Sequence, residues 1–285
     1  MYLSVEQRVR TRPYTEVPPH RIETLLEQGC GPINEDVLLH SGSIFGVFDG
    51  ATTICKSDLP NGITGGLLAA QIAANTFRKG GDDLLFLAKE ANRRISEALG
   101  NVKIPQEKRY RLWSTSAAVI RLEDRHFEYC QTGDSLILII RKDGSFTHLT
   151  PEVNHDRETL RLWKDAPEGR PIHDALKEQI RSVRMEMNVT YGVLNGETQA
   201  LDFIRHGTLQ LDGIASILVF TDGLFLPRED PDHEIDWQRF VDLFRLGGLK
   251  GIYEHVRSLH AQDPDCRKYP RFKQHDDTAA IAISL

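Results

Sequence analysis

IFGVFDGATT, residues 44–53, runs from the pattern of a buried strand directly into an acid, a glycine and then polar residues. SILVFTDGL, residues 216–224, repeats this ending in the other half of the chain. A carboxylate at the end of a buried strand is costly unless it is paired, hydrogen-bonded or bound to a cation. We therefore expect Asp49 and Asp222 to converge on one site. Two other Asp-Gly pairs, at 143–144 and 212–213, are explained as turns.

Further acids stand at similar strand boundaries. Glu35 and Asp36 precede VLL, Asp134 precedes SLILII, and Asp276 precedes TAAIAI. A cluster of acids from several strand ends suits a hard divalent cation, which takes oxygen ligands. Any one of these acids alone is more often a turn or cap residue, so the metal-site prediction depends on the whole set.

The composition is that of an ordinary globular protein and favours neither nucleic acid nor membrane as a partner. The net charge is −6, which argues against an anionic partner surface. The N-terminal residues have no apolar core of signal-peptide length, and no run reaches the roughly 18 apolar residues of a membrane helix. The four cysteines have no zinc-like spacing, as expected for free thiols in a reducing compartment. We expect a cytoplasmic location.

Other catalytic chemistries have no signature in this chain. The sequence contains no GxSxG elbow, no HExxH pair and no GxxxxGK[ST] loop. The eleven histidines include no pair at metal-binding spacing. An oxygen-ligand cation site is the chemistry that the residues favour.

Hydrophobic periodicity predicts an α+β fold. Strands arrive in adjacent groups separated by helical groups, which favours antiparallel sheets with helices packed outside them. Residues 1–25 are predicted to form an N-terminal arm or edge segment, and residues 26–285 a single domain. The expected strands are 36–40, 44–49, 113–121, 126–131, 135–141, 214–220 and 278–284. The expected helices are 64–79, 84–99, 235–246 and 249–260, with a partly helical stretch at 151–185.

Taken in chain order, these pieces resemble the metal-dependent protein phosphatase family (PPM, type 2C), especially its bacterial-type members. The resemblance covers the chain from about residue 28 onward. It implies a four-layer α-β-β-α sandwich, with two central antiparallel β-sheets flanked by helices. The matching stretches are NED at 34–36, VFDG at 47–50, STSAAV at 114–119, TGDS at 132–135, VFTDGL at 219–224 and HDDTAAIAI at 275–283.

The resemblance also implies a centre of two Mn²⁺ or Mg²⁺ ions between the sheets. Asp49 would bridge the ions, with the Gly50 carbonyl and Glu35 joining it on one of them. Asp222 and Asp276 would hold the other ion. Asp134, together with Asp222, could hold a weaker third ion. In this assignment Asp36, which would orient waters on the metals, joins Asp49 and Asp222 as a catalytic residue.

The activity implied is hydrolysis of phosphoserine and phosphothreonine in proteins by direct attack of a metal-activated water. Phosphorylated proteins would then be the substrates, in partnership with a serine/threonine kinase. Two alternatives stay open from the sequence: a catalytically weak phosphatase-like binding module, and a small-molecule phosphatase of the same fold.

The residues that would grip phosphate depart from the family pattern. Gly31 stands where many members carry an arginine, and Ala51 stands where some carry a proton-donating histidine. Lys56 is a candidate substitute for the arginine, as are three arginines near the N-terminus, at positions 8, 10 and 12. The residues for substrate binding are otherwise unassigned.

Overall fold

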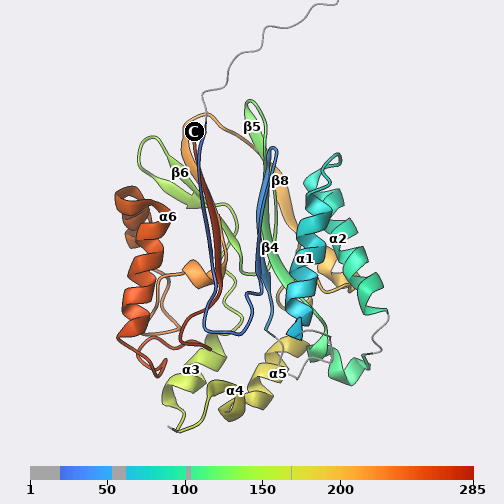
Figure 1. Ribbon diagram of the computed structural model, residues 1–285, viewed down its shortest axis with the longest axis vertical. Helices are drawn as coiled ribbons and strands as arrows, with labels where there is room; N and C mark the ends of the chain where they lie inside the picture. Colours follow the sequence, from blue (N-terminus) through green and yellow to red (C-terminus); the bar gives the residue numbers. More distant parts are fainter. Residues whose placement is uncertain (1–19, 53–61, 101–103, 168) are drawn as a thin grey trace, which may run out of the picture.

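The computed structural model describes residues 20–52, 62–100, 104–167 and 169–285, and these form two antiparallel sheets stacked face to face (Figure 1). The first sheet has the strand order β1-β10-β9-β6-β7 and the second has the order β2-β3-β4-β5-β8. The strands are β1 (Arg21–Glu27), β2 (Asp36–Ser41), β3 (Ile44–Gly50), β4 (Thr115–Leu122), β5 (His126–Thr132), β6 (Leu136–Arg141), β7 (Phe146–His148), β8 (Arg205–Gln210), β9 (Ile214–Phe220) and β10 (Thr278–Ser284).

Helices cover the outer face of each sheet and complete the predicted four-layer sandwich (Figure 1). The helices α1 and α2 pack on the β2-β3-β4 side, and α6 packs on the side of β1, β10 and β9. In the described part of the chain, no helix is long and apolar enough to cross a membrane. The helices are α1 (Gly65–Phe77), α2 (Leu84–Leu99), α3 (Arg157–Asp165), α4 (Ile172–Ala175), α5 (Lys177–Met185) and α6 (Trp237–Ala261), with 3₁₀ turns η2 (Gln106–Arg111), η3 (Thr198–Phe203) and η4 (Asp222–Leu224).

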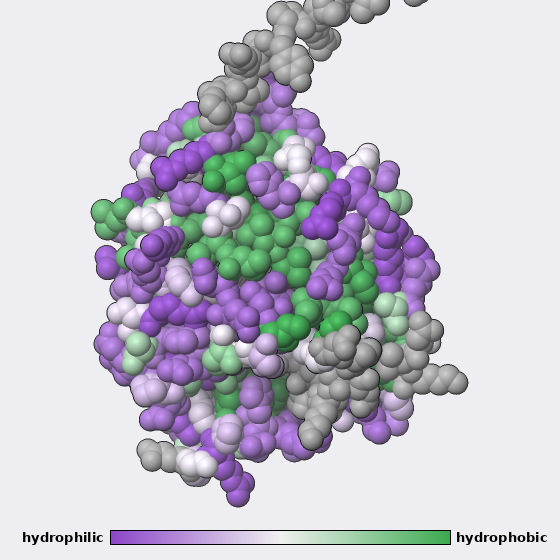
Figure 2. Space-filling model, in the orientation of Figure 1, coloured by the Kyte–Doolittle hydropathy of each residue, from purple (hydrophilic) through white to green (hydrophobic). Residues whose placement is uncertain are grey.

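The space between the sheets is filled by aliphatic side chains at alternate strand positions. Ile217 and Val219 of β9, together with Ile281 and Ile283 of β10, face Val47 and other residues of the second sheet. The central strands β3, β4, β6, β9 and β10 thereby bury one face between the sheets and the other beneath helices, which is why their sequences are largely apolar. On the face shown in Figure 2, hydrophobic residues gather over the middle of the molecule and hydrophilic residues cover its flanks.

The predicted strands and helices are confirmed in kind. The helices predicted at 235–246 and 249–260 are the two segments of α6, and the regular helical backbone breaks between them at Gly248 (φ +64°). The carboxylate of Glu23 accepts a hydrogen bond from the Leu249 amide (3.2 Å) and so caps the second half of the helix. β1 straddles the predicted boundary at residue 25 as an edge strand along β10.

The stretch predicted to be partly helical contains α3, α4 and α5, and these lie at one end of the sandwich (Figure 1). A buried polar network anchors the end of this stretch to the body of the protein. The Arg109 guanidinium forms an ion pair with Glu197 and donates to the carbonyls of Met185 and Met187. Because a buried charge without its partner is costly, this network fixes where the segment around α5 lies.

Candidate metal centre

The acids predicted to share a site all lie at the same end of the sandwich. Asp36 begins β2 and is the direct cross-strand partner of Asp49, near the end of β3. Asp222 follows β9, Asp134 lies in the turn between β5 and β6, and Asp276 precedes β10. In an antiparallel sheet, the start of one strand lies beside the end of its neighbour, so residues far apart in sequence meet at this end of the sandwich.

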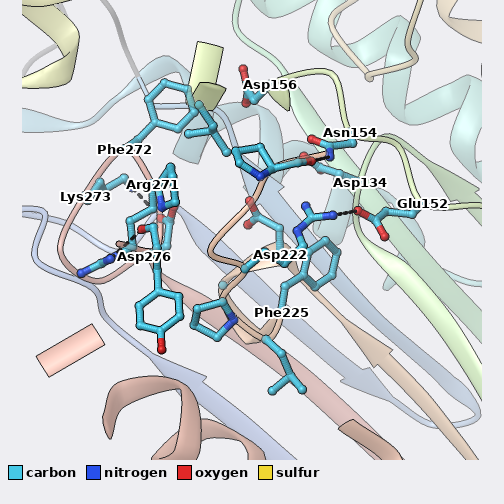
Figure 3. Close-up of a pocket in the computed structure, with 18 of the residues that line it drawn as sticks. Asp134, Glu152, Asn154, Asp156, Asp222, Phe225, Arg271, Phe272, Lys273 and Asp276 are labelled. Carbon is cyan, nitrogen blue, oxygen red and sulfur yellow. Dashed lines mark hydrogen bonds and ion pairs between the residues drawn. The ribbon is translucent and has the colours of Figure 1, made fainter. Parts of the chain in front are cut away.

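Three of these carboxylates come close enough to share an ion. Asp49, Asp134 and Asp222 each offer an oxygen, and the three oxygens lie within 4.8 Å of one another. Figure 3 shows Asp134, Asp222 and Asp276 around one cavity. An all-carboxylate set at this separation fits Mg²⁺ or Mn²⁺ better than a soft metal.

Glu35 and Asp36 are more deeply buried than the other acids, each about 5% exposed. Asp36 accepts a hydrogen bond from the Thr221 hydroxyl (2.7 Å), and the Ala279 amide donates to the same hydroxyl (2.9 Å). This chain of bonds ties the start of β2 in one sheet to β9 and β10 in the other. The Glu35 Oε1 atom is buried and has no hydrogen-bond partner among the described residues. A buried carboxylate oxygen without a partner is costly, and a bound cation would provide one.

Asp276 and Asp277 differ in what their carboxylates contact. Asp276 forms an ion pair with Lys273 (2.6 Å) on the cavity wall (Figure 3). Asp277 instead accepts hydrogen bonds from the backbone amides of Gly29 (2.7 Å) and Glu35 (2.9 Å). Asp277 therefore holds the Glu35 loop in place, whereas Asp276 is available to a cation that displaces or joins Lys273.

Burial and mutual repulsion make the acid cluster hard to ionise without a cation. Burial raises the pKa of Asp49 well above its usual range, and the neighbouring charges of Asp36, Asp222 and Asp134 raise it further. The pKa values of Asp36 and Asp222 are raised for the same reasons. Burial alone would lower the pKa of Lys273, but Asp276 outweighs it and the pKa lies above its usual range. A divalent cation would relieve this repulsion and keep the carboxylates charged.

The glycines of the four Asp-Gly pairs confirm that two pairs differ from simple turns. Gly144 and Gly213 adopt positive φ angles of 89° and 74°, as turn glycines do. Gly50 and Gly223 do not have positive φ, and their requirement for glycine comes from packing. A Cβ at Gly50 would lie 2.5 Å from the backbone of Gly66, and one at Gly223 would lie 1.8 Å from the carbonyl oxygen of Asp277.

The cavity above the acids has two lobes that meet at Asp134, Asp222 and Asp276. One lobe runs toward α6 between Phe225 and Arg271. The other runs toward α5, and its lining includes Ala51 and four residues that the sequence did not single out: His155, Asp156, Arg184 and Tyr191. His155, Asp156 and Tyr191 come from connections without hydrophobic periodicity, and Arg184 comes from the last turn of α5, so no sequence pattern pointed to them.

Only some of the positions considered for phosphate binding lie in the part of the chain that the structure describes. Ala51 does lie in the cavity wall, next to Asp49. Lys56 and the arginines at 8, 10 and 12 fall outside the described residues, so their role stays a prediction. Lys273 is the lysine that the structure brings to the acids, and the sequence analysis did not identify it.

Comparisons with known proteins agree with this geometry. A search of curated protein sequences found no significant match. The fold is similar to several solved structures. One is the catalytic domain of the serine/threonine phosphatase PstP in complex with two manganese ions, at 14% identity and a TM-score of 0.55, covering 93% of this chain and 97% of that chain. Two others are PppA from Pseudomonas aeruginosa (14% identity, TM-score 0.57, 93% of this chain and 97% of that chain) and the PPM Ser-Thr phosphatase MsPP from Mycobacterium smegmatis in complex with cacodylate (19% identity, TM-score 0.54, 93% of this chain and 98% of that chain).

The sequence also matches a family model, described as protein phosphatase 2C, over residues 32–247. This range includes six of the seven predicted catalytic and metal-binding residues, all but Asp276, and both unusual Asp-Gly pairs. By this match and the shared fold, the chain belongs to the protein phosphatase 2C family and is a metal-dependent serine/threonine phosphatase.

Proposed function

We propose that this protein hydrolyses phosphoserine and phosphothreonine in proteins by direct attack of water on phosphorus, using two Mn²⁺ or Mg²⁺ ions held at the acid cluster. The observation that carries the proposal is the meeting of Asp49, Asp134 and Asp222 oxygens within 4.8 Å at the floor of a cavity. Three partly buried carboxylates from different strand ends repel one another when charged, and a shared cation is the partner that would offset this repulsion.

Each residue of the site has a proposed part in holding the ions. Asp49, the Gly50 carbonyl and Glu35 would hold one ion. Asp49, Asp222 and Asp276 would hold the other, and Asp134 with Asp222 would hold a weaker third. When bound, the ions would lower the pKa of a water and offset charge on the phosphoryl oxygens.

The rest of the chain positions the reactants. Asp36 is fixed by the Thr221 hydroxyl, so its second oxygen has a set direction from which to orient an attacking water. The two cavity lobes leave room on both sides of a phosphorylated side chain for a polypeptide substrate. We propose a serine/threonine kinase as the source of that substrate and the cytoplasm as the location.

The test is hydrolysis of a phosphothreonine peptide and of 4-nitrophenyl phosphate, with Mn²⁺ and with a chelator. We expect activity that requires the metal and is lost in Asp222→Asn. The matched control is Asp212→Asn, which changes an exposed Asp-Gly turn and should retain full activity. Chelator-insensitive activity, or full activity in Asp222→Asn, would contradict the metal mechanism.

Two outcomes would support the alternatives. Calorimetric Mn²⁺ binding without turnover of either substrate would indicate a phosphatase-like binding module. Faster hydrolysis of small phosphorylated metabolites than of phosphopeptides would indicate a small-molecule phosphatase.

A further inference from the structure

Another cavity, with a volume of about 680 Å³, lies beside the cavity above the acid cluster. It is lined by the connection that follows α3 and by the segment 262–275 that follows α6. Phe272 and Lys273 line this cavity and also both lobes of the cavity above the acids. Figure 3 shows these two residues with Arg271 on one wall, next to Asp276. The two cavities therefore meet at the edge of the proposed metal centre.

The lining of this neighbouring cavity, which we call the basic cavity, is rich in positive charge. It includes two carboxylates, those of Asp263 and Asp265. The chain as a whole has a net charge of −6, so this concentration of cations runs against its average composition. The cationic residues of the lining are Arg170, Arg267, Lys268, Arg271 and Lys273.

Two of these cations are neutralised within the protein. The Arg271 guanidinium forms an ion pair with Asp263 (2.6 Å), and Lys273 forms one with Asp276 (2.6 Å). Asp263 is itself buried and also accepts hydrogen bonds from three backbone amides of the same segment. These two pairs fix the wall of the cavity and leave the other three cations to give it its charge.

Arg267 is held rigidly but has no carboxylate partner in the part of the chain that the structure describes. Its guanidinium lies over the ring of Trp163, 3.4 Å from the ring centroid, and donates to the carbonyl of Ala166 (2.9 Å). The Trp163 indole N–H donates in turn to the Cys266 carbonyl (2.8 Å). Carbonyl and ring contacts orient the charge of Arg267 without neutralising it.

The other two cations are open to solvent. Arg170 is exposed and forms no ion pair within the described residues. Lys268 is 52% exposed, and its partner Glu229, at 3.4 Å, is 63% exposed, so this pair is weak and easily exchanged. On the acidic side, Asp265 is exposed as well. The basic cavity therefore offers an excess of positive charge to an anionic partner.

We propose that the basic cavity binds acidic residues of the protein substrate that lie a few positions from the phosphorylated serine or threonine; the proposal rests on the phosphatase function proposed above. A polypeptide advances about 3.3 Å per residue, so a substrate held at the metal centre must leave across a wall of its cavity. Passage across Phe272 and Lys273 brings the following side chains to Arg170 and Lys268. Carboxylates there form solvent-exposed pairs, which give a preference among substrates rather than a requirement.

The test compares three phosphothreonine peptides of equal length in Mn²⁺. One has three glutamates before the phosphothreonine, one has three after it, and one has alanines at all of these positions. We expect one of the acidic peptides to exceed the alanine peptide about tenfold in kcat/KM. The difference should lie in KM, because contacts remote from phosphorus are equal in the ground state and the transition state. High salt should reduce it.

Charge reversal on the cavity wall locates the effect. Arg170→Glu should remove most of the preference, and Lys268→Glu should reduce it in the same direction. Both variants should hydrolyse 4-nitrophenyl phosphate at the wild-type rate, because this substrate has no flanking residues. The matched control is Arg205→Glu, an exposed arginine at the start of β8 that lines neither cavity, and it should keep the full preference.

Equal kcat/KM for the three peptides would overturn the binding of acidic residues in the basic cavity, and so would a preference that Arg205→Glu reduces as much as Arg170→Glu does. In both cases hydrolysis of the alanine peptide would leave the proposed function standing. A wild-type protein that hydrolyses none of the phosphopeptides in Mn²⁺ would instead overturn the proposed function, and this inference with it.

Discussion

Replacing Asp222 by asparagine removes a negative charge from the centre of the proposed site, and this should stabilise the metal-free protein. The reason is the repulsion within the cluster, where Asp222 has an oxygen within 4.8 Å of oxygens of both Asp49 and Asp134. At this 4.8 Å separation two unit charges repel by about 3 kcal/mol at an effective dielectric constant of about 20. The substitution removes two such repulsions.

The net gain is smaller than that sum, because protons bound by the cluster already relieve part of the repulsion. We expect Asp222→Asn to raise the free energy of unfolding by about 1–3 kcal/mol in chelator, which is about 2–6 °C in Tm. In Mn²⁺ at one thousand times its dissociation constant, wild type gains about 4.1 kcal/mol. The variant lacks the carboxylate and gains much less, so the order of the two Tm values should reverse.

The pH dependence of the metal-free protein gives the same test a second readout. The pKa values of Asp36, Asp49 and Asp222 are raised in the folded state, so the folded protein keeps protons that the unfolded chain loses above about pH 4. Stability should therefore fall as the pH rises from about 4 toward those raised values, and level off above them. Asp222→Asn should flatten this decline.

The assay is scanning calorimetry in chelator and in Mn²⁺ over a series of pH values, with Asp212→Asn as the control. That exposed substitution should change stability by less than about 0.5 kcal/mol in every condition. If Asp222→Asn is less stable than wild type in chelator, or if Mn²⁺ stabilises both proteins equally, the reasoning about the cluster is refuted.

Three further substitutions test how the site is supported. Gly223→Ala would force a methyl group against the Asp277 carbonyl; urea denaturation should show a loss of about 3 kcal/mol, and calorimetry weaker Mn²⁺ binding. Asp277→Ala removes the acceptor of two backbone amides, so the free energy of unfolding in urea should fall by about 2–4 kcal/mol and Mn²⁺ should bind more weakly. Unchanged Mn²⁺ affinity would contradict the proposal that Asp277 holds the Glu35 loop in place. Gly248→Ala places a side chain on a residue with positive φ and crowds Glu23, so the free energy of unfolding should fall by about 1–2 kcal/mol while kcat stays unchanged. A lowered kcat would show that α6 influences the site.

The sequence predicted best those elements whose surroundings are apolar on both faces. β9 and β10 have the predicted limits, because each is an uninterrupted aliphatic run bounded by turn residues. β8 was not predicted as a strand, and β1 was covered only by the prediction of an N-terminal arm or edge segment. Both are sheet-edge strands with exposed polar positions, RIETLLE and RHGTLQ, so neither has the apolar run or the alternation that marks a strand.

The same contrast holds within the site. Its acids stand at strand ends, where a buried run meets a charged residue, and that position can be recognised from the chain alone. Lys273, His155 and Tyr191 reach the cavity from irregular connections, and their approach depends on how those connections pack in three dimensions. The separate roles of Asp276 and Asp277 were also beyond the sequence, since adjacent side chains point to different partners.

The position of β10 between β1 and β9 has a consequence for how the protein is made. A ribosome delivers residues in order, so β1 and β9 wait without their shared neighbour until residues 278–284 have emerged. Asp276 and the Ala279 amide that steadies Thr221 arrive with the same segment. In the nascent chain, the proposed metal ligand Asp276 and the strand that closes the first sheet therefore arrive late and together.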